Sequence, residues 1–532
     1  MKPKFVVARL LVAAAFVALP AASWAQGPSL LRFCSTGSPK TFDPANSDSG
    51  VDHRATDQIF SQLVEYKRGT DELTPALAER WTVSPDGLQY TFDLRRSVAF
   101  QTTEDFKPTR ELNADDVLFT FGRLLNRDSA FGKALPIVSP YVVSYGWEKL
   151  IAKVEKLSPT QVRFTLAQRD AAFLSALTGS FASIQSAEYG AQLLKSGKPE
   201  RIAMAPVGTG PFQLKSFRVD SQLRLVKHPG WFRAAERPRV DTLVFAVTPD
   251  GNVRAQRLKR DECDIADPVA PADLAELRKD PAIKVSTSPG MNIGYLAFNT
   301  KHPVLGKVEV RQALDMAIDK ATLVKTVFGD AGVLAQTLMP AANWANDPSI
   351  KGNAYNPEKA RELLKKAGAT GKGGLSISLW SMPVIRNYNP NSKLIAQLIQ
   401  SDWAKVGVTA NIVTYEWGEY LRRVDKGEHD TVLLGWNGDT EPANTAGQLG
   451  CGSASGTFWC NADYEKLLAE ARAGLTREAR KAAYAKALRL ATQQLPWSPL
   501  AHGAISVPHR ASVKGFVLSL DSSLYFDGVL PR

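Results

Sequence analysis

Four residues in the second half of the chain could together recognise a small molecule that carries both a positive and a negative charge. They are Arg386, Trp417, Trp436 and Asp439, and the last two belong to the octet LLGWNGDT. A guanidinium suits a carboxylate, a carboxylate suits an ammonium, and tryptophan rings can bury the atoms between them. These residue types indicate a site for a zwitterion. The alternative is that Arg386 and Asp439 pair with each other or with surface neighbours.

The segment that carries these residues alternates between helix and strand patterns. Asn356 and Pro357 are typical of a helix start, and apolar residues continue the pattern to Gly368. The next predicted elements are a helix at 392–405, a strand at 408–412, a short helix at 418–424 and a strand at 431–436. Asp439 therefore follows the carboxyl end of a strand, which is the edge where ligands bind in open α/β sheets.

Other parts of the chain favour strands. The run LQYTFDLRRSVAF, residues 88–100, alternates aromatic and polar residues, and DTLVFAVTP and GYLAFNT are short β-branched or aromatic runs. Residues 484–495 predict one more amphipathic helix, which Pro496 ends. The mixture in a chain of 532 residues predicts an α/β (mixed α+β) fold in two or three domains.

The first 25 residues predict a secretory signal peptide. Basic residues precede an apolar run at 10–19, and the small residues Ser23 and Ala25 are placed for cleavage before Gln26. The apolar run is shorter than the ~20 residues that span a bilayer. We therefore expect a soluble, exported protein.

The charge pattern argues against nucleic acid as a partner. The formal net charge is +12, and loss of Lys2, Lys4 and Arg9 with the signal peptide lowers it to +9. The basic residues are dispersed among acidic ones, without a basic block or a nucleic-acid-binding motif. We expect a solvated basic exterior.

The chain contains four cysteines, and an even number favours disulfides in an oxidising compartment. Four cysteines allow three pairings. Cys451 and Cys460 bracket the loop CGSASGTFWC, so a local disulfide there is the natural pair and leaves Cys34 with Cys263. Zinc is the alternative, but the chain has no CxxC spacing and no histidine near any of the four in sequence.

Sequence signatures of the common enzyme classes are missing. The chain has no GxSxG, HExxH, P-loop or GxGxxG motif, and GSASG carries Ala454 where a nucleophile would stand. The six histidines lack metal-ligand spacing, and Asp115 and Asp116 precede VLFTF as acids at a helix start do. We expect no enzyme activity, no cofactor and no metal. A secreted hydrolase is the distant alternative, because catalytic groups can be assembled in space.

Longer motifs carry a resemblance to a known family. In chain order the motifs are LAERWTVSPDGLQYTFDLRRSVAF, PVGTGPFQL, VRQALDMAIDK, YNPEKARELLKKAG and DWAKVGVTANIVTYEWGEYL. Together they resemble the family 5 solute-binding proteins of peptide ABC transporters, and most closely the dipeptide-binding branch. The resemblance covers essentially the whole mature chain.

The resemblance implies a two-lobed periplasmic binding protein of type II (cluster C) with an extra third domain. Lobe I would comprise residues 26–60, 208–288 and 507–532, the extension domain II residues 61–207, and lobe III residues 289–506. Hinges would lie near Pro289-Gly290 and Ile505-Ser506.

The resemblance also implies roles for individual residues. Asp439 would hold the α-ammonium of a dipeptide and Arg386 its α-carboxylate, with Trp417, Trp436 and Tyr388 around the ligand and Gly435 offering backbone contacts. The family's disulfides would correspond to Cys34–Cys263 and Cys451–Cys460, the pairing favoured above. The expected partners are a dipeptide or short peptide and an inner-membrane ABC permease, and we expect a monomer. Haem, glutathione or an oligopeptide is the alternative ligand within the family.

Overall fold

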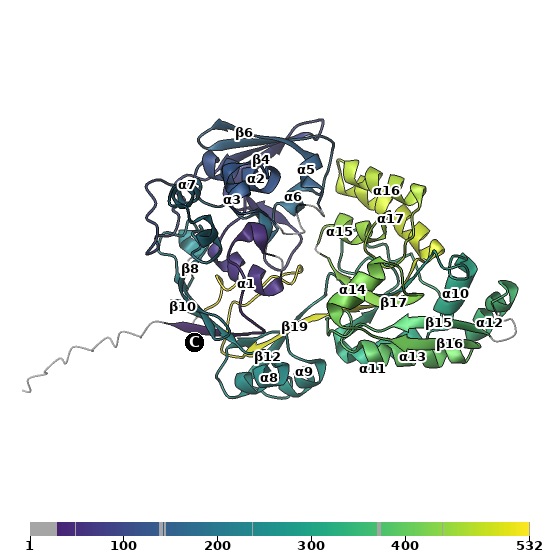
Figure 1. The fold of residues 1–532 in the computed structure, drawn as a ribbon. Helices are drawn as coiled ribbons and strands as arrows, with labels where there is room; N and C mark the ends of the chain where they lie inside the picture. Colours follow the sequence, from purple (N-terminus) through teal and green to yellow (C-terminus); the bar gives the residue numbers. More distant parts are fainter. Residues whose placement is uncertain are drawn as a thin grey trace, which may run out of the picture.

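The computed structural model describes residues 29–47, 49–137, 142, 145–236, 238–369, 374–438 and 440–530. The predicted signal peptide and Asp439 lie outside these residues. The described strands fall into a seven-stranded, a six-stranded and a four-stranded sheet and one two-stranded pair. In Figure 1 the six-stranded sheet and its helices lie on the right, and the other sheets lie on the left. Helices accompany each of the three larger sheets, which confirms the predicted mixed fold.

The range predicted for lobe III contains the six-stranded sheet, in the order β14-β18-β13-β17-β15-β16. Its strands are β13 (Asn292–Phe298), β14 (Gly332–Leu334), β15 (Leu375–Trp380), β16 (Val408–Val413), β17 (Thr431–Asn437) and β18 (Trp497–Gly503). β15 is parallel to β16 and β17, whereas β13 is antiparallel to both β17 and β18. All seven residues of β13 are buried, because the sheet is covered on both faces.

Helices cover the two faces of this sheet separately. Successive strand residues face opposite sides, so Tyr295 packs in one apolar cluster with α14, α16 and α17, and Leu296 in another with α10 to α13. The helices are α10 (Val308–Met316), α11 (Lys320–Phe328), α12 (Pro357–Lys366), α13 (Ser392–Ala404), α14 (Trp417–Asp425), α15 (Pro442–Ala446), α16 (Ala462–Ala473) and α17 (Arg477–Gln494).

The local signals predicted this part of the chain well. α12 begins at Pro357, and the Asn356 side chain accepts a hydrogen bond from the Lys359 N–H at 2.9 Å, as an N-cap does. The predicted elements at 392–405, 408–412, 418–424 and 431–436 are α13, β16, α14 and β17. The helix predicted at 484–495 belongs to the longer α17.

The ranges predicted for lobe I contribute the seven-stranded sheet, in the order β12-β19-β11-β1-β10-β9-β8. Its strands are β1 (Leu30–Ser35), β8 (Phe212–Arg218), β9 (Gln222–Lys227), β10 (Thr242–Val247), β11 (Ile265–Ala266), β12 (Ile283–Ser288) and β19 (Ile505–Arg510). Nearby helices are α1 (Gly50–Ile59), α8 (Gly251–Lys259) and α9 (Pro271–Leu277). β19 begins two residues before the predicted boundary at 507, and the exact domain limits stay predictions.

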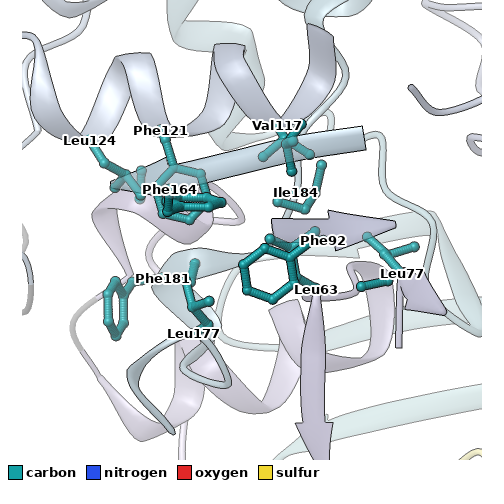
Figure 2. Packing of buried hydrophobic residues seen from close by; sticks show 14 of the residues in the cluster. Leu63, Leu77, Phe92, Val117, Phe121, Leu124, Phe164, Leu177, Phe181 and Ile184 are labelled. Atoms are coloured by element: carbon teal, nitrogen blue, oxygen red, sulfur yellow. The ribbon is translucent and has the colours of Figure 1, made fainter. Parts of the chain in front are cut away.

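The predicted extension domain contains the four-stranded sheet β4-β5-β7-β6 and the β2-β3 pair. Its strands are β2 (Val64–Tyr66), β3 (Leu73–Pro75), β4 (Ala78–Val83), β5 (Gln89–Leu94), β6 (Ile151–Ser158) and β7 (Gln161–Leu166). Its helices include α2 (Ala114–Leu125), α3 (Ala130–Ala134), α5 (Trp147–Leu150), α6 (Phe173–Ala176) and α7 (Ala187–Lys195). Figure 2 shows the apolar core between α2 and the four-stranded sheet. Within it the ring centres of Phe121 and Phe164 lie 4.7 Å apart, with an angle of 81° between the ring planes.

Two details of the extension test the sequence patterns. The acid pair begins α2 as predicted, because the Asp116 carboxylate accepts from the Asn113 N–H at 2.9 Å in a capping box. The strand predicted at 88–100 is too long, since β5 ends at Leu94. Beyond it Ser97 has φ 57°, a left-handed conformation that breaks a strand.

Among the described residues, lobe III meets the rest of the molecule at the chain crossings and at the extension. The chain passes between lobe I and lobe III twice, from β12 to β13 and from β18 to β19. Figure 1 shows β19 reaching between the two sides. On the other side of the space between the lobes, the Ala171 N–H of the extension donates to the Arg472 carbonyl oxygen at 2.8 Å, and Asp71 pairs with Arg477. The space between these two contacts holds the candidate site.

The cysteines pair as expected. Cys34 and Cys263 form a disulfide with their Cα atoms 5.9 Å apart, and Cys451 and Cys460 form another at 4.5 Å. Within the described ranges, no group of histidine, cysteine or acidic residues is arranged to hold a metal ion. No helix in that same part of the chain combines the length and the apolar character needed to cross a bilayer.

Candidate functional site

The carboxyl end of β17 separates two cavities. Trp436 lines a cavity of about 130 Å³, and the next residue, Asn437, lines another of about 540 Å³. Neighbouring strand residues point to opposite faces, which places the cavities on the two sides of the strand end. The smaller cavity lies between lobe III and the extension, and the larger one between lobe III and lobe I.

Arg386 lies in a tight turn that packs on the six-stranded sheet. The Arg386 N–H donates to the Asn389 carbonyl oxygen at 3.1 Å, and the Asn389 N–H donates back to the Arg386 carbonyl oxygen at 2.9 Å. The turn lies directly on three strands, because each contributes a glycine where a Cβ would overlap the turn. These glycines are Gly294 on β13, Gly435 on β17 and Gly503 on β18.

The Arg386 side chain is exposed beside the larger cavity. Its Nη1 donates to the Ile385 carbonyl oxygen at 3.0 Å, and its Cζ lies 5.8 Å from the Trp417 ring centre, a cation–π contact. Among the described residues it has no carboxylate partner. Tyr388 is buried against Gly435; burial raises the pKa of Tyr388, and the Arg386 guanidinium opposes that shift. The turn therefore presents a cation ready for an anionic ligand.

The two predicted tryptophans approach the site from different elements. Trp417 is the first residue of α14 and stacks on Tyr420, with ring centres 5.7 Å apart. Trp436 comes from β17 and lines the smaller cavity. Its indole Nε1 is buried and has no hydrogen-bond partner among the residues that the structure describes. A buried donor without a partner is costly, so a ligand acceptor there would be favourable.

The larger cavity carries an excess of positive charge. Among the described residues that line it are Arg54, Arg254 and Arg386, and the one carboxylate among them is that of Asp267. Arg54 already pairs with Asp267; burial raises the pKa of that aspartate, and Arg54 opposes the shift. The remaining field favours an anion beside Arg386.

The smaller cavity has no such excess. Its acids, Asp170 and Glu441, each face an arginine: Arg472 lies 3.6 Å from Asp170, and Arg480 pairs with Glu441. Burial raises the pKa of Asp170, and Arg472 opposes that shift. The two sides of the β17 end therefore differ: among the described residues, the surplus of positive charge lies on the side of Arg386.

The structure brings most of the predicted site residues together. Arg386 contacts Trp417, and Tyr388 lies on Gly435, which is next to Trp436 in β17. Asp439 lies outside the described residues, so its part in the site stays a prediction, as do the ligand roles of the others.

The sequence patterns missed Gly294, Gly503 and Asn437. Glycine inside a strand pattern often marks close approach of another backbone, and GYLAFNT begins with Gly294. That signal was present for Gly294, but it does not say which backbone approaches, and no strand was predicted around Gly503. Asn437 carries no signal of its own.

Two sheet-based lobes, joined by two chain crossings and enclosing two cavities, define a two-lobed ligand-binding protein with an additional domain. A sequence comparison places it more closely. The family model for bacterial extracellular solute-binding proteins, family 5 (middle region), matches residues 72–457, and the chain belongs to this family. Members of the family are periplasmic proteins that bind substrates.

Individual relatives match along almost the full chain. A protein of Pseudomonas aeruginosa (strain UCBPP-PA14) named di/tripeptide-binding protein 1 is 47% identical, covering 96% of this chain and 95% of its own. Heme-binding protein A of Haemophilus influenzae is 38% identical over 92% of this chain and 89% of its own. A solved dipeptide-binding protein from Pseudoalteromonas sp. SM9913, in complex with Met-Leu, superimposes with a TM-score of 0.83 at 34% identity, covering 94% of this chain and 100% of that one.

Proposed function

We propose that this protein is the periplasmic receptor of an ABC importer. The receptor is a monomer that closes on a dipeptide and delivers it to an inner-membrane permease. The observation that carries the proposal is the exposed Arg386 guanidinium, held on its glycine-seated turn beside a cavity with surplus positive charge. Arg386 binds the α-carboxylate of the ligand. Asp439, three residues beyond Trp436, binds the α-ammonium. The relatives named for dipeptides and di/tripeptides support this choice of ligand.

Closure depends on the ligand for an electrostatic reason. Removing a lone ion from water costs several kcal/mol. When the lobes approach without ligand, Arg386 would lose water with no anion in exchange. A dipeptide supplies a carboxylate to Arg386 and an ammonium to Asp439, so it binds the closed form better than the open form and shifts the population toward closure.

The separation of the two charges sets the length of the ligand. Two extended residues span roughly 7 Å. A longer peptide held at Arg386 places its ammonium beyond Asp439, which leaves one charge without a partner. A dipeptide should therefore bind more tightly than a peptide extended by several residues.

Single substitutions at the two charged residues test the proposal. Asp439→Ala and Arg386→Ala should each weaken dipeptide binding in calorimetry by at least 100-fold, since loss of one partner leaves a ligand charge unpaired. Lys393→Ala, an exposed cation that lines neither cavity, is the matched control and should bind as the unaltered protein does. Unchanged affinity in Asp439→Ala or Arg386→Ala would remove that residue from its role.

The relative named for heme supports one alternative ligand. Haem carries two carboxylates that could use the surplus of cations around Arg386, but it has no ammonium for Asp439. Visible absorption of the purified protein distinguishes the two, because bound haem gives an intense band and a dipeptide gives none.

We also propose that the N-terminal 25 residues direct export and are then removed. The basic and apolar pattern of this segment and its small residues Ser23 and Ala25 support cleavage before Gln26. N-terminal sequencing of protein recovered from a periplasmic fraction should begin at Gln26.

A further inference from the structure

The smaller cavity, beside Trp436, has the size of a pocket for one side chain, and one of its walls is mostly apolar. Its volume is about 130 Å³, close to the ~150 Å³ of an engineered apolar cavity that binds benzene. The wall on the extension side is mostly apolar, with Trp147, Leu150, Phe173 and Ala176. It could accept an isobutyl or phenyl group.

Hydrogen bonds between the extension and lobe III hold the two walls of this cavity at a fixed distance. The Ala171 N–H donates to the Arg472 carbonyl oxygen at 2.8 Å, and the Asn444 Nδ2 donates to the Tyr145 hydroxyl at 3.2 Å. A cavity with walls fixed at this distance can measure the size of a guest. A guest larger than the cavity must break these contacts.

The charged groups at the cavity are already paired. Asp170 faces Arg472, and Glu441 pairs with Arg480 and also accepts from the Ala443 N–H at 3.1 Å. A lysine or arginine guest would have to break one of these pairs to gain a counter-ion, and an acidic guest would meet two carboxylates. An apolar guest disturbs none of them, so the lining selects against charge.

The position of the cavity assigns it to one end of the ligand. Trp436 lines it, whereas Arg386 and Asn437 line the other cavity on the opposite side of the strand end. With the carboxylate of the ligand at Arg386, the second residue of a dipeptide lies toward the larger cavity. The first residue then lies toward Trp436.

We propose that the cavity beside Trp436 receives the side chain of the first residue of the bound dipeptide and selects apolar side chains about the size of leucine or phenylalanine. This inference rests on the proposed dipeptide-binding function and names the class of dipeptide. The second side chain faces the cavity of about 540 Å³, which is large enough to hold water beside many side chains, so the second position discriminates weakly.

Gly447 offers a way to fill this cavity. It lines the cavity, has helical backbone angles (φ −61°, ψ −20°) that any residue adopts, and a Cβ there would meet nothing closer than Arg472 Nη2 at 3.9 Å. Gly447→Leu therefore places an apolar side chain in the cavity without backbone strain. Gly447→Ala fills it by a single methyl group and is the graded control.

The test compares Leu-Gly with Gly-Leu, which have the same composition and the same terminal charges. We expect the unaltered protein to bind Leu-Gly at least tenfold more tightly than Gly-Gly, and Gly-Leu within threefold of Gly-Gly, in calorimetry. In Gly447→Leu the affinity ratio of Leu-Gly to Gly-Leu should fall at least tenfold, with a smaller fall in Gly447→Ala. Circular dichroism and the Tm of each variant establish that it is folded, and if Gly447→Leu does not fold, Gly447→Ala and the three peptides decide the outcome.

Other outcomes overturn the inference or the function beneath it. Equal weakening of Leu-Gly and Gly-Leu in the variants, or equal binding of all three peptides by the unaltered protein, would remove the selective role of the cavity and leave dipeptide binding intact. Selective loss of Gly-Leu would assign the cavity to the second residue instead. Absence of saturable binding of every dipeptide to the unaltered protein would contradict the proposed function itself.

Discussion

The side chain of Asn292 holds both backbone groups of Gly503. Its Nδ2 donates to the Gly503 carbonyl oxygen at 2.7 Å, and its Oδ1 accepts from the Gly503 N–H at 2.8 Å. Asn292 begins β13 and Gly503 ends β18, so the pair joins the two strands where the chain crosses to lobe I. The turn that carries Arg386 lies on the same glycine, because a Cβ on Gly503 would overlap the Asn387 carbonyl oxygen. The crossing between the lobes and the candidate ligand cation therefore share one closely packed point.

Gly503→Ala should weaken dipeptide binding and also destabilise the fold. The added methyl group displaces Asn387 and with it Arg386, at a packing cost of roughly 1–3 kcal/mol. We expect a fall in affinity of at least tenfold in calorimetry and a drop of a few degrees in Tm.

A second glycine provides the control for this substitution. Gly122 lies within α2, and a Cβ there would meet no atom within 4 Å. Gly122→Ala should leave binding unchanged and raise stability by about 0.5–1 kcal/mol, because alanine favours a helix. Binding by Gly503→Ala that equals that of Gly122→Ala would show that the turn does not depend on its contact with the strand.

His502, next to the same point, should make the protein less stable in acid. Its Nδ1 lies 2.7 Å from the Asn292 carbonyl oxygen, and burial lowers the pKa of His502 to about 4. The unfolded chain has a pKa near 6.5 at this residue, so it binds the proton more readily than the folded chain between pH 6.5 and 4. The stability that the neutral ring contributes is present above pH 6.5 and is lost as the pH falls toward 4, by roughly 2–3 kcal/mol.

A substitution that keeps the donor but cannot titrate isolates this effect. His502→Asn retains an N–H toward Asn292. Its Tm should fall less than that of the unaltered protein when the pH is lowered from 7 to 4.5. Between pH 7 and pH 8 both proteins should shift equally, because neither carries a proton change at residue 502 there. Parallel Tm curves throughout the acid range would contradict the assignment to His502.

Asp57 in α1 should have the opposite pH dependence. Burial raises the pKa of Asp57 to about 7, the nearby Asp521 adds to the shift, and the Ser180 hydroxyl and Arg68 oppose it. The folded chain therefore binds the proton more readily than the unfolded chain between pH 3.8 and 7. The favourable contribution of the protonated carboxyl is present below pH 3.8 and is lost as the pH rises through 7.

Asp57→Asn should therefore stabilise the protein at pH 8. The amide stays neutral and its oxygen can still accept from Ser180. The difference in free energy of unfolding between variant and unaltered protein should therefore grow by roughly 2 kcal/mol from pH 5 to pH 7, and the Tm difference should grow with it. Asp86→Asn changes a more accessible carboxyl, whose pKa is lowered by its hydrogen bond from Ser84, and its Tm difference should not grow over that interval. A constant difference for Asp57→Asn would show that Asp57 does not titrate between pH 5 and pH 7 and would contradict its raised pKa.

Local signals predicted the elements that position the site, because their causes are local. The Asn356 cap, the apolar stripe of α13 and the alternation of β16 act within a few residues, and they specified these elements to within a residue or two. The end of β5 was predicted too late, because alternation continues in sequence after Leu94 while the backbone turns at Ser97. The grouping of Arg386, Trp417 and Trp436 came from residue type and from the family resemblance.

The cavities could not be predicted in the same way. The cavity beside Trp436 combines Trp147 and Phe173 of the extension with Gly447 and Arg472 of lobe III. Pairs so far apart in sequence leave no periodic signal, since what joins them is the packing of whole domains. The pair Asn292 and Gly503 is separated by 211 residues and is equally silent in sequence.

The contacts between the extension and lobe III should favour the closed form. Arg477, the first residue of α17, pairs with Asp71 in the turn between β2 and β3, and both side chains are partly exposed. The chain crossings at β12–β13 and β18–β19 lie elsewhere, so opening the lobes about those crossings must separate this pair. An exposed pair is worth about 0–1 kcal/mol, and a change of that size in the closing equilibrium alters apparent affinity by up to about fivefold.

Asp71→Asn should thus weaken dipeptide binding about two- to fivefold without touching either cavity that we assign to the ligand. The substitution removes one charge and leaves Arg477 on the Trp344 ring, 4.8 Å from its centre. Because salt screens exposed charges, the affinity of the unaltered protein should fall between 50 mM and 500 mM NaCl by a larger factor than that of Asp71→Asn. Arg477→Ala and the double variant complete a cycle, in which the second substitution adds little once the first is made. If Asp71→Asn and the unaltered protein bind equally at low salt, the pair does not contribute to closure, and the hydrogen bond from Ala171 to Arg472 becomes the contact to alter next.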